Sequence, residues 1–164
     1  MATGTIILPV QSAKLPTANP ARIDGATVNW KLLFDPSTSQ SGWWQFRMPV
    51  NYASTPVLKL QYTPNATQSG TLSVIWRAYI EGVTAGSDIA TDSYGSANSA
   101  TSTMSNNQAT GILTEISIPL SNIGGTLSPG NFIKIKVDRD ASNGSDTSTG
   151  DAALVNASFE YTTT

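Results

Sequence analysis

The densest group of chemically capable side chains in this sequence is an acidic segment near its end. Four aspartates lie within fourteen positions, among Ser and Asn residues: Asp138, Asp140, Asp146 and Asp151. Oxygen ligands of this kind suit Ca²⁺, and the order Asp-x-Asp-x-Ser-Asn-Gly partly imitates the opening of a calcium-binding loop. The glycine comes one place late, however, and Thr149 stands where a closing glutamate is expected.

The alternative to a metal site is an ordinary turn. Short Asp, Asn and Ser side chains are favoured in turns because they accept hydrogen bonds from nearby backbone amides. In this interpretation the carboxylates cap amides and pair with Arg139. We favour the turn and predict no cofactor; Asp138, Asp140 and Asp146 are the candidate ligands if a metal does bind.

Exposed aromatic side chains are the second group that could bind a ligand. Trp43 and Trp44 are adjacent, so on a strand they point to opposite faces, and the surrounding alternation places Trp44 inside and Trp43 outside. Tyr79 falls on the outer face of its own segment. Such rings stack on sugars or anchor protein interfaces, and Trp43, Tyr52 and Tyr79 are the predicted platform. Alternatively, the N-terminal segment or a loop covers them, because aromatic residues are common in strands anyway.

Catalytic machinery is not evident. The chain has no His and no Cys, so the commonest acid–base group and the thiol nucleophile are both missing. A glycosidase needs two carboxyl groups flanking the scissile bond, but Glu81, Glu115 and Glu160 are predicted on outward positions with nothing to pair them. We therefore predict a protein that is not an enzyme.

Composition narrows the possible partners. Charged residues make up 12% of the 164 positions and the net charge is −2, which argues against nucleic-acid binding because that needs a concentrated basic face. No stretch approaches the roughly 20 apolar residues of a membrane span, and the first residues do not form a signal peptide. A surface of Ser, Thr, Asn and Gly gives little repulsion between copies and permits a crowded assembly.

The elements that must position these side chains are β-strands. Apolar and polar side chains alternate in seven segments: 28–34, 44–48, 58–62, 72–80, 112–120, 133–137 and 155–161. This pattern is typical of antiparallel strands with one face on a core, and it assigns Trp30, Ile112 and Val155 to the core. Turn residues separate the segments. With an eighth strand from the N-terminal segment, they predict an all-β, antiparallel two-sheet β-sandwich, jelly-roll-like in its strand number.

Residues 1–27 differ from the rest of the chain. Pro9, Pro16 and Pro20 interrupt them, and because proline fixes φ and removes a donor, we predict an extended N-terminal arm. Part of the arm either pairs as a strand or lies on a neighbouring subunit. The sandwich domain is then predicted over residues 28–164.

One connection is exceptionally long. Residues 82–110 are small and polar, and loops of this length inside a compact domain are usually functional or disordered. The segment is either a crossover between the sheets or an excursion that contacts a partner.

Two stretches of the sequence resemble segments of other proteins. The first contains Trp30-Lys-Leu-Leu-Phe-Asp-Pro, Trp44-Gln-Phe-Arg-Met-Pro and Pro56-Val-Leu-Lys-Leu-Gln-Tyr62. The second is Pro129-Gly-Asn-Phe-Ile-Lys-Ile-Lys-Val-Asp-Arg-Asp-Ala-Ser, followed by Asp146-Thr and Gly150-Asp-Ala. They resemble a group of small β-sandwich structural proteins from tailed-phage virions, some of which are capsid decoration (cement) proteins. The resemblance implies a jelly-roll-like homotrimer and carries over no catalytic residues.

We therefore predict a virion structural protein: a cement protein on the outer surface of a bacteriophage capsid, stabilising contacts between major capsid proteins. Its predicted partners are the major capsid protein and further copies of itself in a homotrimer, with no nucleic acid and no membrane. The predicted interface side chains are Ile6, Ile7, Leu8, Val10, Leu15, Trp43 and Tyr79. The alternative is a tail-fibre or receptor-binding module, a carbohydrate-binding β-sandwich that uses the aromatic platform.

Overall fold

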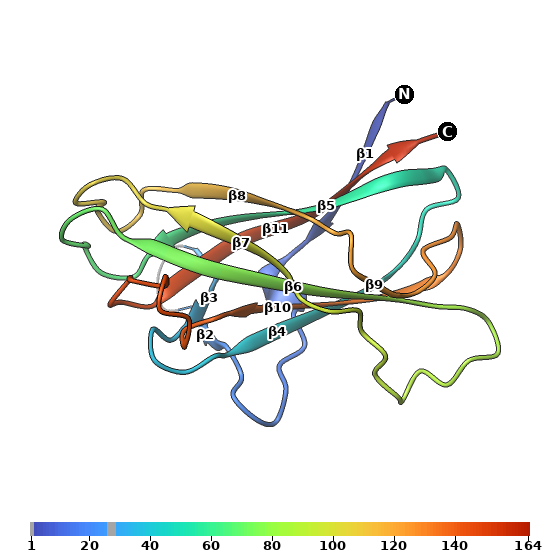
Figure 1. Ribbon diagram of the computed structural model, residues 1–164, viewed down its shortest axis with the longest axis horizontal. Helices are drawn as coiled ribbons and strands as arrows, with labels where there is room; N and C mark the ends of the chain where they lie inside the picture. Colours follow the sequence, from blue (N-terminus) through green and yellow to red (C-terminus); the bar gives the residue numbers. More distant parts are fainter. Residues whose placement is uncertain (1, 26–28) are drawn as a thin grey trace.

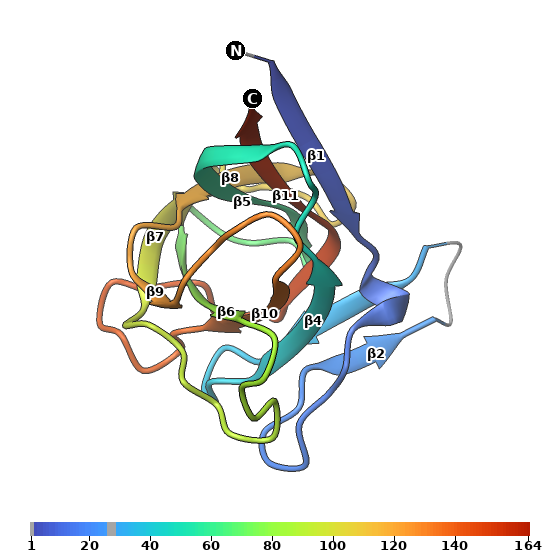
Figure 2. The same cartoon turned by 90° about the vertical axis from the view of Figure 1, so that its right-hand side faces the viewer.

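Two β-sheets face each other across one hydrophobic core (Figures 1 and 2). The computed structural model describes residues 2–25 and 29–164; residues 1 and 26–28 lie outside the described residues, and with them Val28, where the alternation was predicted to begin. The described residues form eleven strands and one short 3-10 helix. The predicted all-β, two-sheet sandwich is confirmed, with more strands than the eight expected.

Sheet A has the strand order β2-β3-β11-β5-β8, and β1 also pairs with β11. Its strands are β1 (Thr3–Leu8), β2 (Arg22–Asp24), β3 (Lys31–Phe34), β5 (Tyr52–Pro64), β8 (Thr114–Pro119) and β11 (Ala152–Thr163). Sheet B has the order β4-β10-β6-β7, and β9 pairs in parallel with β6. Its strands are β4 (Ser41–Arg47), β6 (Ser73–Val83), β7 (Asn98–Thr103), β9 (Ile123–Gly125) and β10 (Phe132–Arg139). Most connections cross from one sheet to the other, which gives the jelly-roll character.

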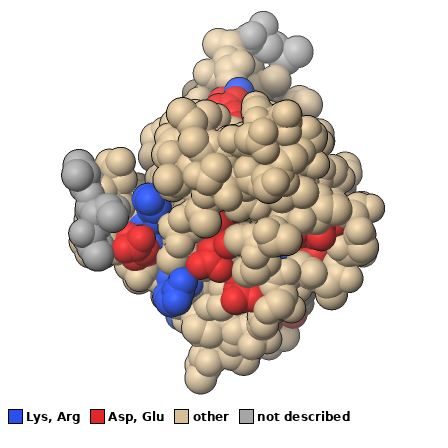
Figure 3. All heavy atoms as spheres, turned by 90° about the vertical axis from the view of Figure 1, so that its left-hand side faces the viewer, with Lys and Arg blue, Asp and Glu red and all other residues tan. Residues whose placement is uncertain are grey.

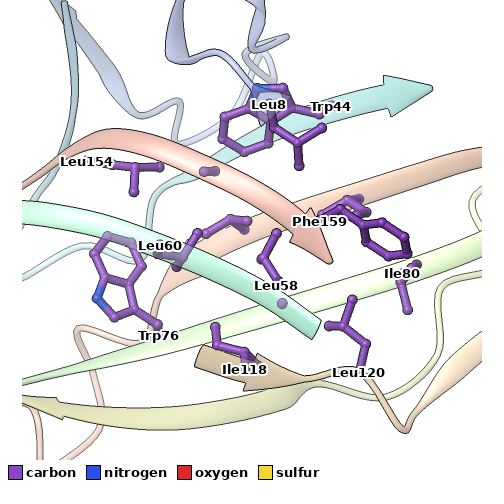
Figure 4. Close-up of a cluster of buried hydrophobic side chains, with 14 of the residues drawn as sticks. Leu8, Trp44, Leu58, Leu60, Trp76, Ile80, Ile118, Leu120, Leu154 and Phe159 are labelled. Carbon is purple, nitrogen blue, oxygen red and sulfur yellow. The ribbon is translucent and has the colours of Figure 1, made fainter. Parts of the chain in front are cut away.

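The alternating residues build the core as predicted. Leu58 and Leu60 from β5 meet Trp76 and Ile80 from β6, and all four side chains are fully buried (Figure 4). Phe159 from β11 joins the same cluster. Burying one such side chain stabilises the fold by about 1.5–3 kcal/mol, so the two inner faces together hold the sheets in register.

Three residues assigned to the core by their spacing lie outside it, and that assignment was wrong. Trp30 is 51% exposed and Ile112 is 57% exposed, because each lies before the first residue of its strand. Val155 is half-buried because a β-bulge interrupts the pairing between Leu154 and Asn156. The bulge places Leu154 in the core instead and turns Val155 to the outer face.

The N-terminal segment is part of the sandwich. β1 pairs antiparallel with β11, and β2 pairs antiparallel with β3. Between them lies the 3-10 helix η1 (Val10–Ser12), and the backbone of Lys14 bridges to Trp43 on the edge of sheet B. Of the two alternatives for the predicted arm, strand pairing is the one observed, because β1 and β2 both join sheet A.

The long polar connection is shorter than the sequence suggested. β6 continues to Val83, and β7 occupies residues 98–103, so residues 104–110 and 84–97 lack a strand, and 84–97 is the longer of the two. The buried ammonium of Lys134 holds the 84–97 segment: its Nζ lies 2.9 Å from Asp92 Oδ1 and 3.1 Å from the carbonyl oxygen of Thr91. The described part of the chain contains no helix with the length and apolar character of a membrane span.

Candidate functional site

The carboxylates of the acidic segment are directed at arginines. Arg139, fully buried, donates from Nη2 to Asp146 Oδ1 at 2.6 Å and from Nε to Asp146 Oδ2 at 2.9 Å. Arg77 Nε lies 2.6 Å from Asp138 Oδ1, and Arg77 Nη1 lies 3.1 Å from Asp140 Oδ1. Burial raises the pKa of Asp138, and the hydrogen bond from Arg77 offsets this only in part. Within residues 2–25 and 29–164, no three acidic side chains converge as metal ligands would.

The three glutamates each contact a neighbouring polar side chain, and Glu115 accepts from Gln61 Nε2 at 2.9 Å. Glu81 is buried and lies 2.9 Å from Lys134 Nζ, beneath the 84–97 segment. Burial lowers the pKa of Lys134, but its hydrogen bonds to Asp92 and Glu81 outweigh burial and raise that pKa above its usual value. Glu160 Oε2 lies 3.1 Å from Lys59 Nζ on the outer face of sheet A.

The predicted aromatic platform is only partly assembled. Trp43, Lys136 and Tyr79 lie side by side across β4, β10 and β6, with both rings half-buried. Lys136 Nζ lies 3.9 Å from the centre of the Tyr79 ring and covers one of its faces. Tyr52 does not join them: it is only 7% exposed and packs against Tyr161, with 5.8 Å between the ring centres. The assignment of Tyr52 to this platform was wrong.

Most of the predicted N-terminal interface side chains face the chain's own core. Leu8 and Val10 are buried, and Ile6 and Leu15 pack against the core half-buried. Ile7 is 57% exposed. Of these five, Ile7 therefore offers the most side-chain surface to a partner.

The structure shows a different candidate site, a groove of about 400 Å³ on the outer face of sheet A. We refer to it as the Trp30 groove; its lining includes Gln11, Trp30, Lys31, Thr63, Leu113 and Val155. Thr63 and Val155 point away from the core and form its floor, and Val155 does so because of the bulge in β11. Trp30 stands on one side and Leu113, 55% exposed, on the other.

The Trp30 ring lies against the backbone of Gly25. A methyl group added at Gly25 would lie 2.7 Å from the six-membered ring of Trp30, so a larger residue there would have to push the indole aside. Glycine at this position lets the backbone and the ring lie close together without such a shift. The indole stands just before the start of β3 with half of its surface exposed.

The opposite wall is fixed by hydrogen bonds. Gly111 has a φ of +86°, and its N–H donates to Thr63 Oγ1 at 2.7 Å, so the 104–113 loop is tied to the groove floor. Gln108, only 4% exposed, donates from Nε2 to the carbonyl oxygen of Ile112 at 2.8 Å and accepts from the N–H of Ser105 at 3.0 Å. A buried amide with its bonding groups satisfied in this way makes the loop rigid.

The groove combines an aromatic face, an aliphatic floor and polar edges. Gln11, Asn29 and Lys31 supply amide and ammonium groups, and no acidic side chain is found among the described residues that line it. The adjoining 65–72 and 104–113 loops contain no charged residue, and Figure 3 shows a broad uncharged area above a band of charged side chains at this end. Such a site can bind an uncharged ring and its hydroxyl groups, but it holds no acid–base pair for hydrolysis.

Sequence reasoning missed this groove because its key residues interrupt the strand pattern. The adjacent apolar pairs Ile112-Leu113 and Leu154-Val155 both break the alternation. Each pair places at least one apolar side chain on the outer surface, so such pairs were the available signal. Nothing in the spacing of Trp30 marked it as external.

Comparison with known proteins supports the fold. No family model matches the chain, and no curated protein matches it. Among solved structures, a family 35 carbohydrate binding module from Clostridium thermocellum is 15% identical, with 95% of this chain and 97% of that chain covered and a TM-score of 0.53. CBM35 from Cellvibrio japonicus Abf62 is 12% identical over 95% of this chain and 92% of that one, with a TM-score of 0.48. These structures are carbohydrate-binding β-sandwich modules.

Proposed function

We propose that this protein is a carbohydrate-binding β-sandwich module and that the Trp30 groove is its binding site. The observation that carries the proposal is the half-exposed Trp30 ring, which lies against Gly25 at the edge of a groove. Sugar rings carry an apolar C–H face that packs on an indole, while their hydroxyls need hydrogen-bonding groups nearby. The fold likeness to a family 35 module agrees with this role.

The rigidity of the groove also supports binding. One wall is ordered before a ligand arrives by the hydrogen bonds of Gln108, and on the other side the Trp30 ring packs against Gly25. A site that is already ordered loses less conformational entropy on binding. A shallow groove can therefore still give measurable affinity for a short oligosaccharide.

The test is a glycan array with the full chain, followed by calorimetric titration of the best ligand. We expect Trp30→Ala to weaken binding by about tenfold or more, since a stacked aromatic anchor contributes about 2 kcal/mol. Trp43→Ala is the matched control and should bind like the unmodified chain. Unchanged binding by Trp30→Ala, or binding lost only in Trp43→Ala, would contradict the proposal.

Decoration of a phage capsid, the role predicted from the sequence, is a further proposal for the same chain. It is supported by exposed apolar side chains on the N-terminal strands: Ile7 on β1 is 57% exposed and Ile23 on β2 is 46% exposed. In this role the protein would be a homotrimer on the outer surface of the capsid, bound to the major capsid protein. The double variant Ile7→Ser, Ile23→Ser should then lose trimers in light scattering and capsid binding in sedimentation. A monomeric unmodified chain that fails to bind capsids would refute it.

A further inference from the structure

One arginine differs from the other three in its surroundings. Arg22, Arg77 and Arg139 each pair with at least one aspartate. Arg47 has no carboxylate partner among the described residues. Arg47 is exposed, so its guanidinium can be reached by a ligand.

Arg47 lies at the end of the outer face of sheet B. Its neighbours across the sheet are Phe132 on β10 and then Val83 on β6. These three residues help to line a hollow of about 460 Å³, enclosed by the 84–89 segment on one side and the 129–131 turn on the other. The strand ends and loops concerned are at the end of the sandwich that faces the viewer in Figure 2.

The guanidinium is oriented by the backbone. Arg47 Nε donates to the carbonyl oxygen of Gly130 at 3.2 Å, and this leaves both terminal nitrogens for other acceptors. Gly130 has a φ of +82° and a methyl group there would lie 3.4 Å from Arg47 Nη2, so glycine suits both the turn and the contact. A guanidinium held at its Nε presents its two terminal nitrogens together, which matches a planar carboxylate or one edge of a sulfate.

The hollow contains nothing that would repel an anion. No acidic side chain is found among the described residues that line it. Asp88 belongs to the 84–89 segment but lines the neighbouring hollow, and its carboxylate accepts from the N–H of Ala90 at 2.8 Å. Thr84 and Ser87 bring two hydroxyls 3.1 Å apart, and Phe132 adds a half-buried aromatic ring.

We propose that this hollow is a separate binding site, which takes an acidic saccharide unit. The carboxylate or sulfate of the sugar pairs with Arg47, the apolar face of its ring lies on Phe132, and its hydroxyls reach Thr84 and Ser87. The saccharide part rests on the proposed function, whereas the anionic part rests on Arg47 alone. The site is independent of the Trp30 groove because the two lie on the outer faces of different sheets.

The test follows the backbone amide resonances of the isotopically labelled full chain during titration. The probes are glucuronic acid, glucose 6-sulfate, glucose and inorganic sulfate. We expect at least one acidic sugar to shift the amides of residues 83–89 and 129–132, and glucose to leave them unchanged. A response to glucuronic acid alone identifies a carboxylate site, and a response to glucose 6-sulfate alone identifies a sulfate site.

Variants separate this site from the groove. Arg47→Gln should weaken acidic-sugar binding by about tenfold, the loss expected for one charge-assisted hydrogen-bonded pair. Two control variants should leave acidic-sugar affinity unchanged: Arg22→Gln, which removes another exposed arginine, and Trp30→Ala. Added NaCl should weaken acidic-sugar binding, because salt screens the attraction between the charges.

Three results would overturn the proposal. They are an absence of shifts with both acidic sugars, acidic-sugar binding that survives Arg47→Gln, and inorganic sulfate binding as tightly as the sugar sulfate. Failure of the proposed function has a different signature. In that case neutral glycans do not bind and Trp30→Ala has no effect, while the shifts that depend on Arg47 persist.

Discussion

The acidic segment at 138–151 and the Trp30 groove show opposite uses of chemically capable side chains. In the acidic segment, the carboxylates are taken up by the protein's own arginines, and the central pair between Arg139 and Asp146 is fully buried. In the groove, an aromatic ring and polar side chains remain at the surface around a hollow. The acidic segment has the residue types of a functional site but stabilises the fold, whereas the groove is built from residues with a core-like pattern and is open to a ligand.

The two regions differ in how their polar groups are placed. A carboxylate whose acceptor positions are filled by an arginine and a backbone amide has little left for a ligand. Asp146 is such a group, since Oδ2 accepts from both Arg139 Nε and the N–H of Ile75. The polar residues of the groove are arranged around a hollow, where a ligand can reach them.

The largest effect on stability is expected when the buried ion pair of the acidic segment is broken. Asp146→Ala leaves the guanidinium of Arg139 buried without its carboxylate, so we expect the free energy of unfolding to fall by about 3–5 kcal/mol. For a chain of this size the melting temperature should drop by roughly 10 °C. Thermal unfolding monitored by circular dichroism measures this. A drop of only a degree or two would mean that the pair contributes little.

An intermediate effect is expected at Gln108, which contributes both to the stability of the fold and to the order of the groove wall. Gln108→Ala removes the amide that fixes the groove wall and leaves the carbonyl oxygen of Ile112 without its partner, at a cost of about 1–3 kcal/mol. Because the wall loses its order, glycan affinity should also fall several-fold, by about 1 kcal/mol in ordering cost. Chemical denaturation and calorimetric titration of the same sample measure both changes. Unaltered affinity in a destabilised variant would separate the wall from binding.

The smallest effect on stability is expected for the exposed ion pair of the acidic segment, in contrast to its buried pair. Arg22→Gln breaks the pair with Asp151, in which the arginine side chain is 68% exposed. An exposed pair of this kind contributes about 0.2–1 kcal/mol, and salt should reduce even that. Urea unfolding at low and high NaCl compares this variant with Asp146→Ala. A loss as large as that of Asp146→Ala would show that exposure does not decide the strength of these pairs.

The sequence was a good guide wherever a strand is regular. Leu58 and Leu60, alternating with Lys59, mark a half-buried strand because side chains repeat every two residues. Trp30 could not be placed in the same way, since a residue just before a strand is not bound by the period of that strand. Tyr52 was misplaced because neither its burial nor its ring contact with Tyr161, 109 positions later, can be read from local spacing.

Contacts between distant parts of the chain could not be predicted from the sequence. Arg22 and Asp151 are 129 positions apart, so their pairing depends on β2 and β11 both flanking β3. Arg139 and Asp146 are seven positions apart, and here the sequence did suggest that the carboxylates of this turn pair with Arg139. Local turn chemistry was thus visible in the sequence, whereas the walls of both hollows come from segments that only the fold brings together.

The bulge at Val155 has an evolutionary consequence. On either side of it the strand keeps its register, with Leu154 opposite Tyr62 and Ala157 opposite Leu60. Deleting one codon at Val155 would make the pairing with β5 continuous from Ala152 to Glu160 and keep Leu154 and Ala157 in phase, while the hollow above it would lose part of its base. A lineage can therefore gain or lose this surface through a single in-frame insertion or deletion, without redesigning the interior.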